Sequence, residues 1–123
     1  MSARQVLIVD DEPLIRWSIT ESLAGAGYIV EEADAAASAL KMIATASEPF
    51  HVVVLDLRLP DMNDLSLLST LRQVLPSALL ILMTAFGTAE ILEDARQLGA
   101  KVLAKPFELD QLNRLVATAH PES

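Results

Sequence analysis

The sequence contains no cysteine, and this absence excludes a disulfide framework, thiol chemistry and any zinc site built on thiolates. Basic residues are also scarce, because 9 Lys and Arg stand against 17 Asp and Glu and give a formal net charge of −8. Binding to nucleic acid requires a basic face, so we do not expect this chain by itself to bind DNA or RNA. The excess of acid either serves solubility or marks a local cation site.

Long hydrophobic runs are missing as well. No apolar stretch approaches the roughly 20 residues that are needed to span a bilayer. The N-terminal segment also lacks the long apolar region and small-residue cleavage site of a signal peptide. We therefore predict a cytoplasmic protein with no membrane segment. The 123 residues, 52% of them hydrophobic, suit one globular domain over 1–123 whose core needs no covalent staple.

Short apolar runs alternate with segments of helical periodicity along the whole chain. Continuous apolar runs predict strands that are buried on both faces. Four such runs are present, at 6–9, 52–55, 79–83 and 102–104. A more polar run at 28–33 predicts a fifth strand nearer an edge. Strands that alternate with helices require a parallel sheet with right-handed crossovers, so we predict a doubly wound α/β domain with five strands and five helices.

Polar or charged side chains follow four of the five predicted strands. These residues are Asp10, Asp11 and Glu12 after the first strand, Asp56 after the third, Thr84 after the fourth and Lys105 after the fifth. In an open parallel sheet the carboxyl ends of the strands share one edge, and function collects there at the point where the strand order switches. We therefore expect these side chains to lie together.

The chemistry of this set points to phosphoryl transfer. Asp10, Asp11 and Asp56 would repel one another unless a cation offsets them, and Lys105 or a divalent metal could do so. Oxygen-only ligands favour a hard ion, and so few carboxylates suit Mg²⁺ better than Ca²⁺. A metal, an ammonium and the hydroxyl of Thr84 around one carboxylate are the parts that phosphoryl transfer needs, and the carboxylate can serve as nucleophile.

Each of these residues alone has an ordinary structural interpretation. An acid pair after a strand commonly caps a helix or forms a turn, and the same holds for Asp56. A single threonine after a strand is uninformative, and a Lys-Pro pair is usually a loop feature. The conjunction at four strand ends of one sheet is what favours a functional site.

Four segments carry a resemblance to a known family. They read VLIVDDEP, VVVLDLRLPDM, MTAFG and AKPF, and with them the chain resembles a response-regulator receiver domain of two-component signalling over essentially its whole length. The resemblance implies a flavodoxin-like strand order, 2-1-3-4-5. It also implies that the domain is a signalling switch rather than an enzyme, with self-catalysed phosphoryl transfer and autodephosphorylation only.

The resemblance further implies a role for individual residues. Asp56 is expected to be the phosphoacceptor, and Mg²⁺, with Mn²⁺ as a substitute, is expected to bind Asp10, Asp11, Asp56 and the backbone carbonyl of Arg58. Thr84 and Lys105 are expected to bind the phosphoryl group, and the bond from Lys105 to Pro106 is expected to be cis. Possible modulators of the phosphoryl group are the side chains of Arg58, Ala85 and Phe86.

Two positions depart from the family pattern. Asp64 stands where glycine is common, and because Asp tolerates a left-handed conformation we expect an altered loop rather than a broken one. Val102 stands where an aromatic switch residue is usual, so the resemblance supports the phosphorylation chemistry better than the usual relay from threonine to aromatic. Trp17 lies where partner kinases often dock, although partial burial in the helix packing is the favoured interpretation.

The leading hypothesis is a switch that a sensor histidine kinase phosphorylates at Asp56. The family then signals through the surface of the fourth helix, fifth strand and fifth helix, where members form homodimers or meet partners. The segments DLRLPDM and PLIRWS also resemble those of receivers placed ahead of an ATPase and a DNA-binding domain. The chain could therefore be the N-terminal fragment of a longer transcriptional regulator.

Three alternatives remain open at this point. The first is a receiver-like interaction module that is not phosphorylated, which the departures at Asp64 and Val102 would favour. The second is an Asp-nucleophile phosphohydrolase, although Arg58 stands where such enzymes place a second aspartate. The third is a flavin-binding domain of similar topology, which would need a phosphate-binding loop after the first strand, where this chain has acids instead.

Overall fold

The computed structural model describes residues 4–85 and 87–119 and contains five strands and five helices in strict alternation. The strands are β1 (Gln5–Val9), β2 (Ile29–Ala33), β3 (Val52–Asp56), β4 (Leu79–Thr84) and β5 (Lys101–Ala104). The helices are α1 (Pro13–Gly25), α2 (Ala36–Thr45), α3 (Ser66–Val74), α4 (Ala89–Gln97) and α5 (Leu109–Ala117). The predicted doubly wound α/β fold is thus confirmed.

All neighbouring strands pair in parallel, and their order is β2-β1-β3-β4-β5, as the family resemblance implied. β3 is buried at every position, because it lies at the centre of the sheet with helices on both faces. β2 lies at one edge, as its polar composition predicted.

The prediction for residues 102–104 was wrong in one respect. β5 is the other edge strand, so Lys101 and Ala104 are exposed and only Leu103 is buried. A short apolar run shows that a segment is a strand, but its length does not reveal whether a second strand will pair with its outer side.

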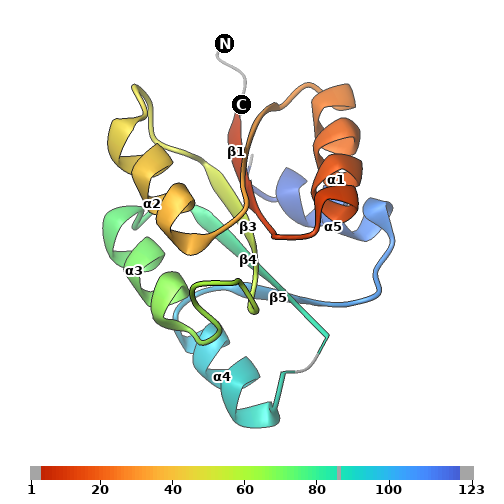
Figure 1. Cartoon of the computed structure of the whole chain (residues 1–123). Helices are drawn as coiled ribbons and strands as arrows, with labels where there is room; N and C mark the ends of the chain where they lie inside the picture. Colours follow the sequence, from red (N-terminus) through yellow and green to blue (C-terminus); the bar gives the residue numbers. More distant parts are fainter. Residues whose placement is uncertain (1–3, 86, 120–123) are drawn as a thin grey trace.

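Helices cover both faces of the sheet (Figure 1). Successive side chains along a strand point to opposite faces, so Leu7 and Val9 enter one core while Val6 and Ile8 enter the other. The first core packs against α2, α3 and α4, and the second packs against α1 and α5. The chain passes from β1 to the edge strand β2 and then returns past β1 to β3, β4 and β5, so the strand order switches between β1 and β3.

Glycine ends two of the helices in the expected places. Gly27 and Gly99 are the residues with positive φ in the described chain, at +100° and +83°. Gly99 directly follows the last turn of α4, where its amide hydrogen donates to the carbonyl of Arg96. A residue with a Cβ is strained in this left-handed conformation, so glycine is the natural choice after the helix.

Candidate phosphoryl-transfer site

The polar residues predicted at the strand ends meet at one edge of the sheet. Asp10 follows β1, Asp56 ends β3, Thr84 ends β4 and Lys105 follows β5. Asp10, Asp56 and Thr84 are the buried polar or charged residues of the described chain, with relative exposures of 0%, 9% and 6%. Burying three such groups is costly unless they are paired, so their clustering marks this edge as a site.

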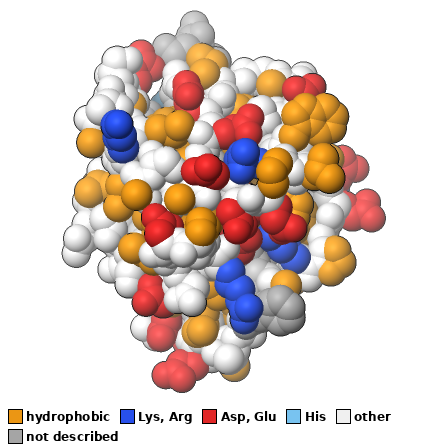
Figure 2. Space-filling model, viewed as in Figure 1, with side chains coloured by type: hydrophobic (Ala, Val, Ile, Leu, Met, Phe, Trp, Pro, Cys, Tyr) orange, Lys and Arg blue, Asp and Glu red, His pale blue; other side chains and the backbone are white. Residues whose placement is uncertain are grey.

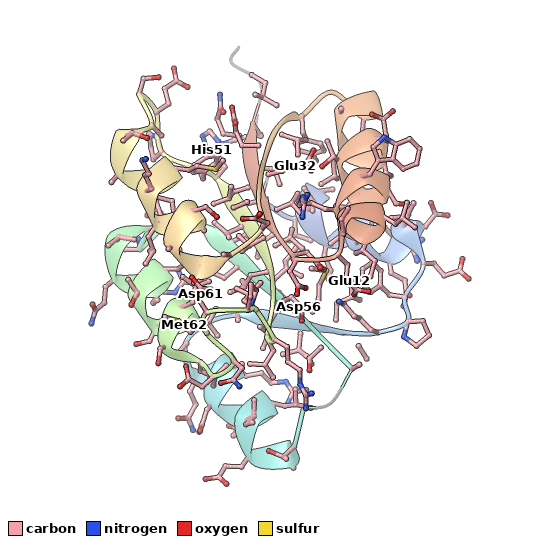
Figure 3. All side chains as sticks on the ribbon, in the orientation of Figure 1. Glu12, Glu32, His51, Asp56, Asp61 and Met62 are labelled. Carbon is pink, nitrogen blue, oxygen red and sulfur yellow. The ribbon has the colours of Figure 1, made fainter. Side chains whose placement is uncertain are left out.

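The ammonium of Lys105 links the carboxylates of the site. Its Nζ lies 2.9 Å from Asp56 Oδ2, 3.3 Å from Asp10 Oδ2 and 3.8 Å from Glu12 Oε1. Figure 3 shows Asp56 and Glu12 near one another at the centre of this edge. One cation therefore offsets three anions, and the cluster keeps a net negative charge that can attract a metal ion.

The pKa values of Asp10 and Lys105 are both raised, Asp10 mainly by burial and Lys105 by its acidic neighbours. Burial raises the pKa of Asp10 above its ordinary value, and the nearby charge of Asp56 adds to the rise; the amide of Glu12 and the ammonium of Lys105 only partly oppose it. Burial works against the charged form of Lys105, but the hydrogen bond to Asp56 and the charges of Asp10 and Asp56 outweigh it and raise the pKa of the ammonium. Lys105 thus stays protonated at neutral pH.

Backbone hydrogen bonds fix the segments that carry these groups. The amide of Asp10 donates to Ala33 O at 3.1 Å, and the amide of Lys105 donates to Thr84 O at 2.9 Å. The two carboxylates each accept an amide from two residues on, because Glu12 N lies 2.8 Å from Asp10 Oδ1 and Arg58 N lies 3.1 Å from Asp56 Oδ1. Strand pairing and tight turns therefore hold the site rigidly.

Three carboxylates in this cluster fit a hard divalent ion. Asp10, Asp11 and Asp56 each offer an oxygen, and these oxygens lie within 4.8 Å of one another. Two oxygens on opposite sides of one Mg²⁺ lie about 4.2 Å apart, since each bond is about 2.1 Å long. Asp11 is exposed, so solvent can reach that side of the cluster and supply the waters that Mg²⁺ usually keeps.

The remaining predicted residues lie around this cluster. Arg58 and Ala85 are exposed beside it, and the Lys105–Pro106 bond is cis. Phe86 lies outside the described residues. The Asp64 carboxylate accepts the amide of Ser66 at 2.9 Å at the start of α3. Since no described residue other than glycine has a positive φ, the left-handed conformation considered for Asp64 is not adopted.

Val102 lies on edge strand β5 and is half-buried. Its register partner is Leu82, two residues before Thr84. Together with Ala100, Lys101 and Leu115 it lines a hollow of about 470 Å³ between α4 and α5. No aromatic ring occupies this position, so a relay from Thr84 to an aromatic at 102 is not available to this chain.

The favoured interpretation of Trp17 as a packing residue was wrong. Its side chain on α1 is 60% exposed, and Leu14 on the same helix is 79% exposed. Hydrophobic side chains gather on the surface over α1, beside the charged centre (Figure 2). A hollow of about 510 Å³ lies next to Leu14, lined also by Ala85, Pro106 and Phe107, so an apolar surface borders the acidic site.

Sequence patterns did not identify two residues that support the site. Arg16 on α1 donates to the backbone carbonyl of Asp10, and Asp61 in the loop after β3 accepts the amides of Ala36 and Ala37 at the start of α2. These contacts are made to main-chain atoms of other segments, which leave no trace in a pattern of residue types. Among the described residues, no helix is long and apolar enough to cross a membrane.

Comparison with known proteins gives one consistent result. The family model of the response regulator receiver domain matches residues 6–117. The DNA-binding transcriptional regulator NtrC of Escherichia coli (strain K12) is 37% identical over 115 residues, which are 93% of this chain and 24% of NtrC. The chain therefore spans about a quarter of the length of this relative.

Solved structures agree in fold. A CheY-like response regulator receiver domain protein from Methanospirillum hungatei JF-1 superposes with a TM-score of 0.88 at 30% identity, covering 98% of this chain and 96% of that one. The beryllofluoride-activated NtrC4 receiver domain dimer superposes with a TM-score of 0.85 at 29% identity, covering 95% and 96%.

Proposed function

The chain belongs to the response-regulator receiver domains, the signalling domains of two-component systems, and from this premise we propose that it is a switch phosphorylated at Asp56. One observation carries the proposal. The Asp56 carboxylate is buried at the end of the central strand, 2.9 Å from the Lys105 ammonium and within reach of two further carboxylates. A merely structural aspartate would not need this surrounding set.

In the proposed reaction, a carboxylate oxygen of Asp56 attacks the phosphorus of a phosphohistidine on a sensor histidine kinase. An oxygen–phosphorus bond forms as the nitrogen–phosphorus bond breaks, and the electron pair of that bond returns to the imidazole nitrogen. Lys105 stays close enough to neutralise the transferred oxygens, and the Thr84 hydroxyl from the adjoining strand donates a hydrogen bond to them.

We propose that Asp10, Asp11, Asp56 and the backbone carbonyl of Arg58 hold Mg²⁺, for which Mn²⁺ can substitute. When bound, the ion neutralises charge on the phosphoryl oxygens. The chain's own contribution is to place one carboxylate oxygen from each of Asp10, Asp11 and Asp56 within 4.8 Å of the others. The oxygen-only donor set supports this ion over softer metals.

Phosphorylation would replace the single negative charge of the Asp56 carboxylate with a phosphoryl group that carries about −1.5 to −2 charges and three strong acceptor oxygens. Lys105 and Thr84 are then drawn toward the new group. Their segments are joined directly, because the amide of Lys105 donates to Thr84 O at 2.9 Å. This backbone link supports a route from the site to the surface of α4, β5 and α5 that requires no aromatic at Val102.

The exposed residues of α1 are the proposed docking surface for the kinase. Leu14 and Trp17 are the second and fifth residues of α1, which follows the acidic loop, and the hollow beside Leu14 reaches Lys105 of the site. A helix that carries the phosphohistidine could bury these apolar side chains while it delivers the phosphoryl group. We propose Arg58, Ala85 and Phe86 as modulators of the reaction.

We further propose that the domain, residues 1–123, works in the cytoplasm as the N-terminal part of a longer transcriptional regulator. The short share of NtrC that the chain covers supports this arrangement. Contact with DNA would then fall to another domain. The NtrC4 receiver domain forms a dimer when activated by beryllofluoride, which supports homodimerisation of this chain after phosphorylation.

The proposal is tested by incubating the protein with acetyl phosphate and Mg²⁺ and measuring its intact mass. We expect one phosphoryl adduct, which should be lost in the Asp56→Asn variant and in a chelated sample. If Mg²⁺ binds and no adduct forms, the chain is instead a receiver-like interaction module that is not phosphorylated.

A further inference from the structure

Arg16 connects the edge strand β2 to the loop that carries the acid pair. From the first turns of α1, its Nη1 donates to the backbone carbonyl of Asp10 at 2.7 Å. Its Nε donates to Glu32 Oε1 at 2.9 Å. The side chain of Arg16 is only 19% exposed, and that of Glu32 is 38% exposed. The labelled Glu32 lies beside α1 in Figure 3, so the guanidinium is held between two segments rather than extended into solvent.

The hydrogen bond from Arg16 holds the backbone carbonyl of Asp10, whose amide and carboxylate already have other partners. Strand pairing already holds the amide of Asp10 on Ala33 O, and the amide of Glu12 and Lys105 Nζ hold its carboxylate. The carbonyl of Asp10 is the group that a side chain, rather than the strand or the turn, keeps in place. A substitution can therefore remove this one contact while the sheet pairing remains.

Asp11 depends on that carbonyl for its position. Within the described chain its exposed carboxylate makes no hydrogen bond or ion pair of its own. The peptide unit between Asp10 and Asp11 is planar, so fixing its carbonyl also fixes the direction in which the chain enters Asp11. The carboxylate of Asp11 nevertheless lies within 4.8 Å of those of Asp10 and Asp56.

We infer that Arg16, oriented by Glu32, is a positioning residue that holds the Asp10 carbonyl and thereby keeps Asp11 in place to bind the divalent ion. The inference rests on the proposed metal site. A positioning role for Arg16 and the positive charge of Arg16 predict opposite effects of its removal on cation binding. Removing a positive side chain near the site should strengthen cation binding by Coulomb's law, whereas losing a positioning residue should weaken it.

Four proteins separate these effects: wild type, Arg16→Met, Arg16→Lys and Arg96→Met. Arg16→Met removes both the charge and the hydrogen bonds. Arg16→Lys keeps the charge but lacks the planar fork that reaches Asp10 and Glu32 together. Arg96→Met removes an exposed arginine from α4 and controls for the loss of one positive charge.

Mg²⁺ is titrated into each protein without a phosphodonor, and binding is followed by the amide chemical shifts of residues 10–12 and 56–58. We expect about tenfold weaker binding in Arg16→Met, as is typical when a group that orients a metal ligand is lost. Arg16→Lys should fall between this variant and the wild type, and Arg96→Met should bind as the wild type does. With acetyl phosphate present, raising Mg²⁺ should restore the phosphorylation rate of Arg16→Met.

Unchanged or tighter binding in a folded Arg16→Met protein would overturn the inference and leave the metal site standing. If that variant does not fold, Arg16→Lys decides, and wild-type affinity in it overturns the positioning role. A wild-type protein whose shifts do not saturate with Mg²⁺ would instead refute the metal site itself, and the inference with it.

Discussion

At the scale of single residues, the site is a compromise between stability and function. Asp10 is fully buried, and its charge is offset by Lys105, which it shares with Asp56 and Glu12. Buried like charges that share one cation destabilise the fold. The same uncompensated charge can attract a divalent ion, so the fold gives up stability at the place where we propose that the metal binds.

Replacing Asp10 with asparagine should make the metal-free protein more stable at neutral pH. A carboxyl whose pKa is raised in the folded state weakens folding as the pH rises through its unfolded value and then through its folded value. The gain in the free energy of unfolding should therefore be present at pH 7 and vanish near pH 3. Urea unfolding in a chelator at both pH values measures it, and Asp11→Asn, which removes an exposed charge, should gain less. A loss of stability in Asp10→Asn would contradict this balance.

Replacing Lys105 with methionine should slow phosphorylation by acetyl phosphate about 100-fold, the usual effect of removing one group that stabilises a developing oxyanion. Mg²⁺ should bind at least as tightly, because a competing cation has left the cluster. Lys101→Met is the matched control, since Lys101 is exposed at the other end of β5. A Lys105→Met protein that is phosphorylated at the wild-type rate would remove Lys105 from the site.

At the scale of the elements, single side chains join segments that the sheet does not connect. Arg72 of α3 donates to five carbonyls, which belong to the end of α4 and to the loop before β4. Its partners are the carbonyl oxygens of Leu75, Pro76, Ala78, Leu98 and Gly99, at 2.8 to 3.5 Å. This guanidinium therefore anchors the C-terminal end of α4 to α3.

The Arg72→Met variant should lose about 2 kcal/mol of unfolding free energy, because hydrogen bonds to a charged group contribute more than neutral ones and several carbonyls lose their donor. Urea unfolding followed by circular dichroism measures the loss. Arg96→Met, at an exposed position of α4, should change stability by no more than about 0.5 kcal/mol. Equal effects of the two substitutions would refute the anchoring role of Arg72.

Asp61 plays a comparable part at the start of α2. Its two carboxylate oxygens accept the amides of Ala37 and Ala36, both at 2.9 Å, and these hydrogen bonds lower the pKa of Asp61. A lowered pKa adds stability above the unfolded value of about 3.9, and this stability is lost as the pH falls through the folded value. Asp61→Ala should thus unfold at lower urea than wild type at pH 7 and approach it at pH 3. Asp94→Ala, on the exposed face of α4, is the control, and a pH-independent difference for Asp61→Ala would contradict the account.

The sequence allowed the strands to be placed to within about one residue at each end, because each is a short run of strand-forming residues between turn signals. It also placed Asp10, Asp56, Thr84 and Lys105 at one edge, since the alternation of strands and helices predicts parallel strands whose carboxyl ends share an edge, whereas the strand order itself came only from the family resemblance. The exposure of β5 and Trp17 was not predictable, because a hydrophobic side chain does not reveal whether a partner covers it. Arg16, Asp61 and Arg72 escaped prediction because each binds main-chain atoms, which leave no trace in a pattern of residue types.

At the scale of the whole molecule, two features surround one edge of the sheet. The acidic cluster is the proposed place for the ion and the phosphoryl group, and the apolar surface of α1 beside it is the proposed place for the kinase (Figures 2 and 3). In the same proposal, the surface made by α4, β5 and α5 transmits the phosphorylation signal. The central claim on which all of this depends is that Asp56 itself accepts the phosphoryl group.

The most direct measurement locates the acceptor in the chain. The protein is incubated with phosphoramidate and Mg²⁺, the acyl phosphate is reduced with borohydride, and peptides are sequenced by mass spectrometry. Reduction converts an aspartyl phosphate to homoserine, so the account predicts homoserine at position 56 and unmodified aspartate at positions 10 and 11. Homoserine at another aspartate, or at none, would contradict the account.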